Sequence, residues 1–177
     1  MSKKVLLLHG WGGSDKPHWQ AWLSGELAKE YGCVNFLRFS DVDAPSLSVW
    51  MSELNAALES FQPDIVVCHS LANTLWFHLC HTNPNISIEK LYLVAPPSLN
   101  CKVTELQEFF PINIPTKLYA KKVTLVSSTN DPYMEEKEVK ELVKKLQIPH
   151  KILFNAGHIN TDSGYGKWEW ILKEINS

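Results

Sequence analysis

The sequence predicts an α/β fold, a three-layer α/β/α arrangement around a mostly parallel six-stranded sheet. First, short β-rich apolar runs alternate along the chain with segments of helical periodicity, which is typical of a parallel sheet covered on both faces. Second, no repeat, linker or low-complexity segment interrupts residues 1–177, so we expect one domain. Third, right-handed crossovers in the commonest doubly wound arrangement give the strand order 2-1-3-4-5-6.

Six apolar runs are the expected strands, and helical segments separate them. The strands are predicted over residues 4–9, 34–39, 64–69, 90–95, 123–127 and 151–154. Pro17 favours the start of the first helix, where its missing N–H is tolerated. Apolar stripes at helical spacing predict later helices within residues 50–61, 139–146 and 168–175, and a short helix is expected over residues 104–110.

Several side chains at helical spacing are interpreted as packing rather than chemistry. Trp19, Trp22 and Leu23 share one face of the first helix, and we expect them to fill space against the sheet. His18 precedes them, and we expect packing rather than catalysis from it as well. Glu136 and Lys140 stand four apart on a predicted exposed helix face, where such pairs stabilise modestly.

Charge and composition exclude several classes of function. A net charge of −2 provides no electrostatic surface for nucleic acid or anionic membrane, and the lysine pairs at 121–122 and 144–145 are expected on solvated faces. The apolar stretch at residues 5–8 is too short for a signal peptide, and no run approaches the length of a membrane span. We therefore expect a cytoplasmic protein.

No cofactor or metal is predicted. Cysteines at positions 33, 68, 80 and 101 lack C-x-x-C spacing, so buried thiols are favoured over disulfides or zinc ligands. His78 and His81 lie three apart, but no third ligand is evident nearby. The glycine-rich loop at residues 9–14 lacks the phosphate-binding G-x-x-x-x-G-K-[ST] pattern.

Residues 68–72 predict a nucleophile elbow with Ser70 at its apex. They follow the apolar run at residues 64–67, as in the strand-to-helix turn of the G-x-S-x-G motif. Cys68 and Ala72 stand where that motif has glycines, which leaves the geometry of the elbow and its effect on rate open. The loop at residues 9–14 should lie beside Ser70, because ligands bind where the winding of such sheets reverses.

His158 is the predicted general base for Ser70, because a serine hydroxyl needs one to become nucleophilic. It follows the last strand, at the carboxyl end of the sheet, whereas His150 begins that strand and so lies at the opposite end. His69 adjoins Ser70 in sequence, but neighbouring side chains point in different directions, so we expect it to brace the elbow.

Asp131 is the predicted carboxylate that orients His158. It follows the fifth strand at the correct end of the sheet, while Asp64 starts the third strand, and Asp41 and Asp43 follow the distant second strand. The chain order Ser70, Asp131, His158 is that of an α/β-hydrolase triad. The competing interpretation is that Asp131 caps a helix beginning near Pro132.

Two backbone N–H groups are expected to stabilise the oxyanion of acyl transfer. In this geometry they belong to Leu71, which follows the nucleophile, and to Trp11 or Gly12 in the loop after the first strand. The Trp11 side chain either walls the acyl pocket or packs inward. Gly12, Phe109 and Phe110 are the other predicted pocket residues.

These motifs together resemble the small serine hydrolases of the YdeN and retinoblastoma-binding-protein-9 type. The resemblance rests on residues 9–14, 17–23, 130–133 and 156–168 together with the Ser70 elbow, and it spans nearly the whole chain. It implies a lidless, minimal α/β-hydrolase core, the Ser70–Asp131–His158 triad and hydrolysis of small esters.

The expected activity is therefore a serine esterase that acts on small carboxylic esters through an acyl-enzyme. A thioesterase or acyltransferase would use the same residues. The alternatives of other classes are a non-catalytic protein-binding role on the same fold, with no partner indicated by the sequence, and a flavodoxin-like nucleotide binder with the same strand order. Small acyl groups are favoured over long lipid chains because this chain offers little covering structure.

Overall fold

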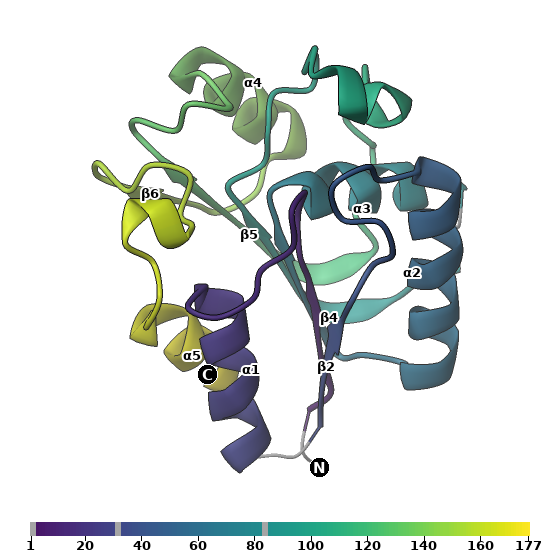
Figure 1. Ribbon diagram of the computed structural model, residues 1–177, viewed down its shortest axis with the longest axis vertical. Helices are drawn as coiled ribbons and strands as arrows, with labels where there is room; N and C mark the ends of the chain where they lie inside the picture. The colour runs from purple at the N-terminus through teal and green to yellow at the C-terminus, as the bar shows by residue number, and fades with distance from the viewer. Residues whose placement is uncertain (1–2, 31–32, 83–84) are drawn as a thin grey trace.

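The centre of the molecule is a sheet of six parallel strands in the order β2-β1-β3-β4-β5-β6, seen in a computed structural model that describes residues 3–30, 33–82 and 85–177 (Figure 1). The predicted strand order is confirmed. The strands are β1 Val5–Leu8, β2 Val34–Leu37, β3 Ile65–His69, β4 Ile88–Val94, β5 Ala120–Ser128 and β6 His150–Leu153.

Strand β5 begins three residues before the predicted boundary. Lys121 and Lys122 belong to it, and their side chains are exposed while their strand pairs with β4. Lys121 also forms an ion pair with Glu89 of β4. Hydrophobicity does not reveal this half of the strand, because its side chains face water although its backbone continues the ladder.

Within the described ranges, five α-helices and two short 3₁₀ helices surround the sheet. The α-helices are α1 Trp19–Glu30, α2 Leu47–Phe61, α3 Leu71–Thr82, α4 Glu136–Leu146 and α5 Glu169–Asn176; the 3₁₀ helices are η1 Thr104–Phe109 and η2 Thr161–Ser163. Helix α1 begins two residues after Pro17, the predicted start. The Nδ1 atom of His18 accepts the Gln20 N–H at 3.1 Å and so satisfies a donor of the first turn.

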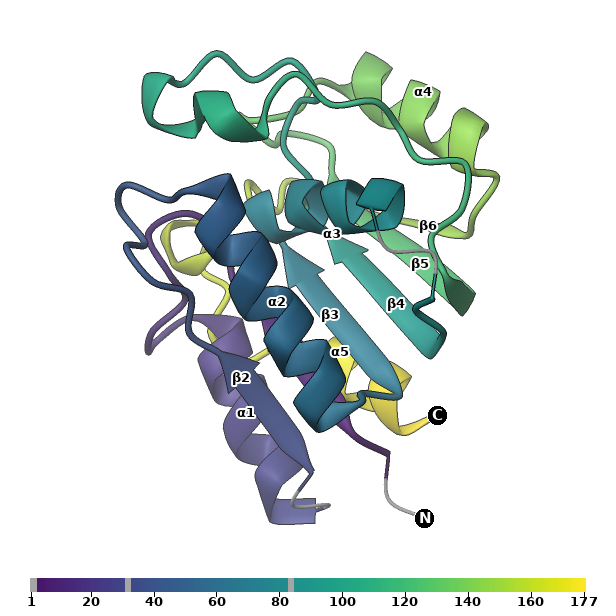
Figure 2. The ribbon, with the colours of Figure 1, turned by 90° about the vertical axis from the view of Figure 1, so that its right-hand side faces the viewer.

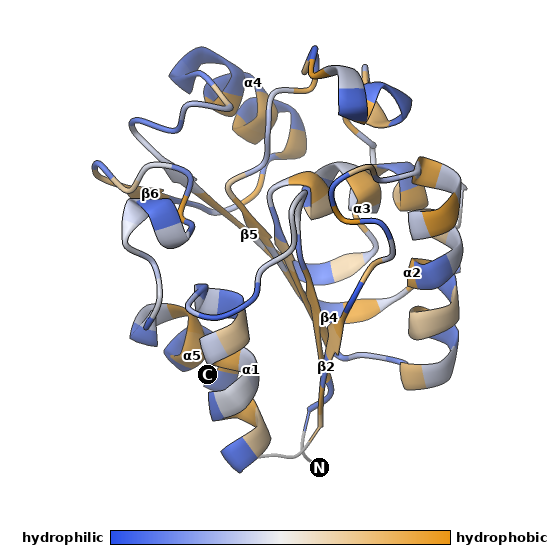
Figure 3. Ribbon diagram, viewed as in Figure 1, coloured by the Kyte–Doolittle hydropathy of each residue, from blue (hydrophilic) through white to orange (hydrophobic). Residues whose placement is uncertain are grey.

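Alternate strand residues face opposite helical layers, as a period of two requires. Leu6 and Leu8 pack in the core beneath α2, α3 and α4, whereas Val5 and Leu7 pack against α1 and α5. Figure 2 shows α2 and α3 crossing one face of the sheet, and Figure 3 shows apolar strands between the layers. The three-layer α/β/α prediction is therefore correct.

The predicted packing roles hold for Trp19 and Leu23 and for two of the four cysteines, whereas Trp22, Cys33 and Cys101 are only half-buried. Trp19 and Leu23 are fully buried against the α1 and α5 side of the sheet. Burial raises the pKa of Cys80 to about 12 and holds that of Cys68 well above its ordinary value, so neither is a reactive thiol. Among the described residues, no helix is long and apolar enough to cross a membrane.

His78 and His81 attach the η1 region to helix α3 instead of pointing to a shared ligand. The Nε2 atom of His78 lies 3.0 Å from the Phe109 carbonyl oxygen, and that of His81 lies 3.0 Å from the Asn113 carbonyl oxygen. The two contacts hold the carbonyl of the last residue of η1 and a carbonyl of the segment that follows it. Within the ranges that the structure describes, no three His, Cys, Asp or Glu side chains form a metal-binding group.

Candidate active site

Ser70 lies in a strained turn between β3 and α3. Its φ of 53° is in the left-handed region, which a residue with a Cβ adopts only when its surroundings hold it there. Here the Ser70 N–H donates to the Val94 carbonyl at 3.0 Å, and the Asn73 side-chain amide donates to the Ser70 and Val94 carbonyls at 2.8 and 2.9 Å. Asn73, which the sequence analysis did not single out, thus fastens the elbow to β4.

The elbow forms with Cys68 and Ala72 at the two glycine positions of the motif. Both are fully buried in the core on the α2 and α3 side. Close approach is provided by a different glycine, Gly10 at the end of β1. A Cβ atom on Gly10 would lie 2.7 Å from the Ser70 Cβ and 3.2 Å from the Leu71 nitrogen.

Replacing Gly10 with alanine is therefore expected to displace the elbow. Because the added methyl group overlaps the Ser70 side chain, we expect the free energy of unfolding to fall by about 1–3 kcal/mol. We also expect ester turnover to fall at least tenfold more than the fraction of folded protein does. Urea unfolding and ester turnover measure the two effects. Gly25→Ala is the matched control, because a Cβ there meets nothing within 4 Å; equal behaviour of the two variants would contradict the assignment.

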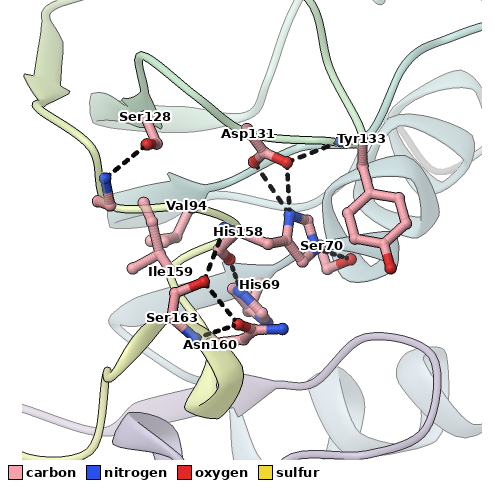
Figure 4. A network of polar contacts seen from close by, with 12 residues as sticks. His69, Ser70, Val94, Ser128, Asp131, Tyr133, His158, Ile159, Asn160 and Ser163 are labelled. Atoms are coloured by element: carbon pink, nitrogen blue, oxygen red, sulfur yellow. Dashed lines mark hydrogen bonds and ion pairs between the residues drawn. The ribbon is translucent and has the colours of Figure 1, made fainter.

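Ser70, His158 and Asp131 form a continuous row of hydrogen bonds (Figure 4). The Nε2 atom of His158 lies 2.8 Å from the Ser70 Oγ, and its Nδ1 lies 2.9 and 3.0 Å from the two Asp131 carboxylate oxygens. The side chains of His158 and Asp131 are 8% and 3% exposed. This is the geometry in which an imidazole can take a hydroxyl proton while a carboxylate fixes its tautomer.

Asp131 is positioned by its own turn and does not cap helix α4. Its Oδ1 atom accepts the Tyr133 N–H at 2.9 Å. Helix α4 begins only at Glu136 and carries a capping box formed by Glu135 and Glu138. The competing interpretation of Asp131 as a helix cap is therefore wrong, although the carboxylate does stabilise a local turn.

Side chains at the end of β5 and in the loop that follows it hold the loop after β6. The Asn130 Oδ1 atom accepts the Gly157 N–H at 2.8 Å, and the Ser128 Oγ accepts the Ala156 N–H at 2.9 Å. Since β5 and β6 are neighbouring parallel strands, these bonds join the loop of Asp131 to that of His158. Sequence reasoning missed both residues, for which the polar run at 127–131 was the available signal.

The His158 backbone is held from the other side by the elbow and by η2. The His69 Nε2–H donates to the His158 carbonyl at 3.0 Å, and the His158 N–H donates to the Ser163 Oγ at 3.1 Å. Ser163 in turn donates its hydroxyl to the Asn160 Oδ1. His69 thus braces the loop that carries His158, and Figure 4 shows this network below the triad.

The two predicted oxyanion donors from the β1 loop can be distinguished. The Gly12 N–H donates to the Val42 carbonyl at 2.9 Å and is therefore not available to a substrate. Trp11 is the remaining choice, and its indole Nε1–H is fixed by the Asp43 carbonyl at 3.0 Å. Leu71 is the first residue of α3, where backbone N–H groups lack intrahelical acceptors.

A pocket of about 220 Å³ opens above Ser70. Trp11 lines it, which settles the open question of its side chain, but Gly12, Phe109 and Phe110 do not. Phe109 is fully buried and packs edge-on against Trp50, with ring centroids 5.6 Å apart. The apolar walls come instead from Leu71, Pro97, Cys101, Val103 and Leu106, and the remaining lining residues are Gly13, His18, His69, Tyr133, His158, Asn160 and Thr161.

Three buried histidines near the site are kept neutral. Burial, and then the nearby His158, lowers the pKa of His18 to about 4, and burial lowers the pKa values of His9 and His69 as well. His9 is structural: its Nδ1 contacts the Gly10 carbonyl at 2.8 Å and its Nε2 accepts the Phe39 N–H at 3.0 Å. It ties the loop after β1 to the end of β2.

These histidines predict acid sensitivity of the fold. With a pKa of about 4 in the folded state against 6.5 ordinarily, the unfolded chain binds more protons at His18 between those values, so stability falls as pH drops through that window. His18 alone accounts for a loss of up to about 3 kcal/mol in the free energy of unfolding across this window. Urea unfolding at pH 7 and pH 4.5 measures the loss. His18→Asn should reduce the difference in the free energy of unfolding between the two pH values, and an unchanged difference would contradict the prediction.

The parallel sheet, the strained serine turn and its position at the carboxyl ends of the strands define an α/β-hydrolase. A family model described as serine hydrolase matches residues 5–177, so the chain belongs to that family. The predicted membership of a serine hydrolase family is thereby confirmed. A comparison with curated protein sequences gives no significant match.

Solved structures share this fold at low sequence identity. The ydeN gene product of B. subtilis superposes with a TM-score of 0.85 at 20% identity, covering 99% of this chain and 97% of that chain. A YdeN-like hydrolase from Pectobacterium atrosepticum superposes with a TM-score of 0.79 at 21% identity, covering 97% of this chain and 88% of that chain. A monoacylglycerol lipase from Paleococcus ferrophilus superposes with a TM-score of 0.68 at 13% identity, covering 97% of this chain and 91% of that chain.

Proposed function

We propose that the protein is a carboxylesterase that cleaves small esters or thioesters through an acyl-enzyme on Ser70. The observation that carries the proposal is the 2.8 Å contact between the Ser70 Oγ and the His158 Nε2, with Asp131 on the opposite nitrogen of the ring. Serine needs such a base to attack a carbonyl near neutral pH. Family membership supports hydrolysis as the reaction class.

In acylation, the Ser70 Oγ bonds to the substrate carbonyl carbon as its proton passes to the His158 Nε2. The carbonyl oxygen becomes an oxyanion that the Leu71 and Trp11 N–H groups stabilise. The intermediate collapses, the bond to the leaving group breaks, and His158 returns the proton to that group. Water then repeats the sequence on the acyl-enzyme and releases the carboxylic acid and free Ser70.

Pocket size supports short acyl groups. The cavity of about 220 Å³ is below the roughly 300–1,000 Å³ of sites for drug-sized ligands. Its apolar walls suit a short hydrocarbon, and the covering segment between β4 and β5 contributes only the six residues of η1 as regular structure. A long acyl chain would leave much of its length in water.

A chain-length series of p-nitrophenyl esters tests this selectivity. We expect kcat/KM to be highest for short acyl chains and to fall as the chain lengthens beyond the pocket. A maximum at long chains would overturn the proposal of small substrates. Matched ester, thioester and amide substrates, each with a Ser70→Ala control, identify the leaving group, and turnover of none of them would favour the non-catalytic binding role.

A further inference from the structure

His18 lines the same pocket as Ser70 but has no part in the mechanism above. It stands between the β1 loop and helix α1 and is 5% exposed. Its ring packs against those of His69 and Trp19, with centroid distances of 4.9 and 5.5 Å. These contacts fix the ring in one position against the wall of the pocket.

The hydrogen bonds of His18 determine which nitrogen carries its proton. The Nδ1 atom accepts the Gln20 N–H, so it holds a lone pair. A pKa lowered to about 4 by burial makes the ring neutral near pH 7, with a single proton. That proton must be on Nε2. Among the described residues, this buried Nε2 has no hydrogen-bond partner.

A buried donor without an acceptor is costly in a folded protein and calls for an explanation. The structural demand on His18, acceptance of the Gln20 N–H, is met by Nδ1 alone. The Nε2–H is therefore a group whose acceptor is expected to arrive with a ligand.

The pocket has two chemically different sides, which indicate the part of the substrate that this donor meets. Residues 97–106, between β4 and the end of η1's first turn, supply apolar walls, while His18, His158, Asn160 and Thr161 supply polar ones. Figure 1 shows η1 lying apart from the η2 loop and the start of α1. His158 must protonate the departing group, so that group lies on the polar side.

The ring of His69 connects His18 to His158 on this side. Its centroid lies 4.9 Å from that of His18 and 5.2 Å from that of His158. His18 and His158, the base that protonates the leaving group, thus pack against the same ring. Asn160 and Thr161 follow His158 directly in the chain and line the same side.

Building on the proposed esterase function, we propose that the His18 Nε2–H binds an acceptor oxygen on the leaving group of the substrate. The preferred substrates are then short acyl esters of alcohols that carry an ether, carbonyl or hydroxyl oxygen a few bonds beyond the ester. An acceptor that reaches Nε2 is almost fully withdrawn from water. In that setting a missing hydrogen bond has its largest effect on selectivity.

Ester pairs that differ by one oxygen test the proposal. The first pair is 3-methoxypropyl acetate and pentyl acetate, and the second is 4-methoxybutyl acetate and hexyl acetate. The rate of hydrolysis is measured from the acid that is released. Within each pair the alcohols are nearly isosteric and similar in leaving ability. We expect a kcat/KM ratio of about tenfold or more in favour of the ether in at least one pair. Ratios near one in both pairs would overturn the proposal.

Two variants separate substrate binding from structural support. His18→Asn keeps an acceptor near the Nδ1 position, but its shorter side chain places no donor at the Nε2 position, so the ether preference should fall to about one. His18→Gln places an amide N–H near the Nε2 position and should retain part of it. Structural damage alone lowers kcat/KM equally for both esters of a pair and leaves their ratio unchanged. An unchanged ratio in His18→Asn would therefore also overturn the proposal.

His81→Asn is the matched control, because His81 lies on helix α3, contacts the Asn113 carbonyl and does not line the pocket, so its ratio should equal that of the unaltered protein. A fluorophosphonate probe tests the esterase function separately, because its leaving group is a single fluoride and carries no oxygen for the His18 Nε2–H to bind. Labelling at Ser70 without an ether preference would contradict the His18 proposal alone. Absence of labelling in the unaltered protein would contradict the esterase proposal itself.

Discussion

Ser70→Ala is expected to lower ester turnover by about a thousandfold to a millionfold. The variant removes the oxygen that forms the acyl bond, whereas the pocket and the Leu71 and Trp11 N–H groups stay in place. What remains is the slower attack of water on a bound ester. Initial rates with a short p-nitrophenyl ester measure the loss, and a urea unfolding curve shows whether the fold is kept.

Ser60→Ala is the matched control for this experiment. Ser60 lies on helix α2, and its hydroxyl donates to the Ala56 and Ala57 carbonyls of the preceding turn. We expect this variant to retain full activity. If Ser70→Ala kept more than a tenth of the original kcat, the nucleophile would have to be another group.

Asp131→Asn is expected to lower kcat by about a thousandfold to ten-thousandfold. The amide can still accept the Tyr133 N–H through its oxygen, so the local turn is kept. Its NH₂ group, however, would face the His158 Nδ1 and favour the tautomer whose Nε2 carries a proton. That tautomer cannot accept the Ser70 proton, so the row of hydrogen bonds remains while the base is lost.

The exposed Asp162 of η2 provides the comparison for the charge change. Asp162→Asn alters net charge by the same amount close to the site, and we expect its kcat to stay within twofold of the original. Rates as a function of ester concentration distinguish kcat from KM. Equal losses in the two variants would indicate a general electrostatic effect and would contradict a specific role for Asp131.

The sequence predicted the sheet well because parallel strands buried on both faces are continuous apolar runs. The strand order followed from general rules of handedness, and it placed residues 70, 131 and 158 at one edge without any contact information. Chain order and sheet end were therefore sufficient to propose the triad. The hydrogen bonds that hold it, such as those of Asn73, depend on backbone positions that no periodicity encodes.

The errors occurred where an apolar residue had two places to pack. Phe109 and Phe110 were predicted to wall the pocket, but Phe109 is buried against Trp50 and its carbonyl contacts His78. Sequence shows that a side chain avoids water, yet it does not show which cavity receives it. Similarly, Gly12 was a candidate oxyanion donor until its N–H was found on the Val42 carbonyl.

The proposed reaction requires Ser70 to be an activated nucleophile, and covalent labelling tests this most directly. The folded protein is treated with a fluorophosphonate probe, digested, and mapped by peptide mass. We predict one adduct on the peptide that contains Ser70, absent in Ser70→Ala and formed much more slowly in His158→Ala. No adduct, or an adduct on another serine with Ser70 unmodified, would contradict the account.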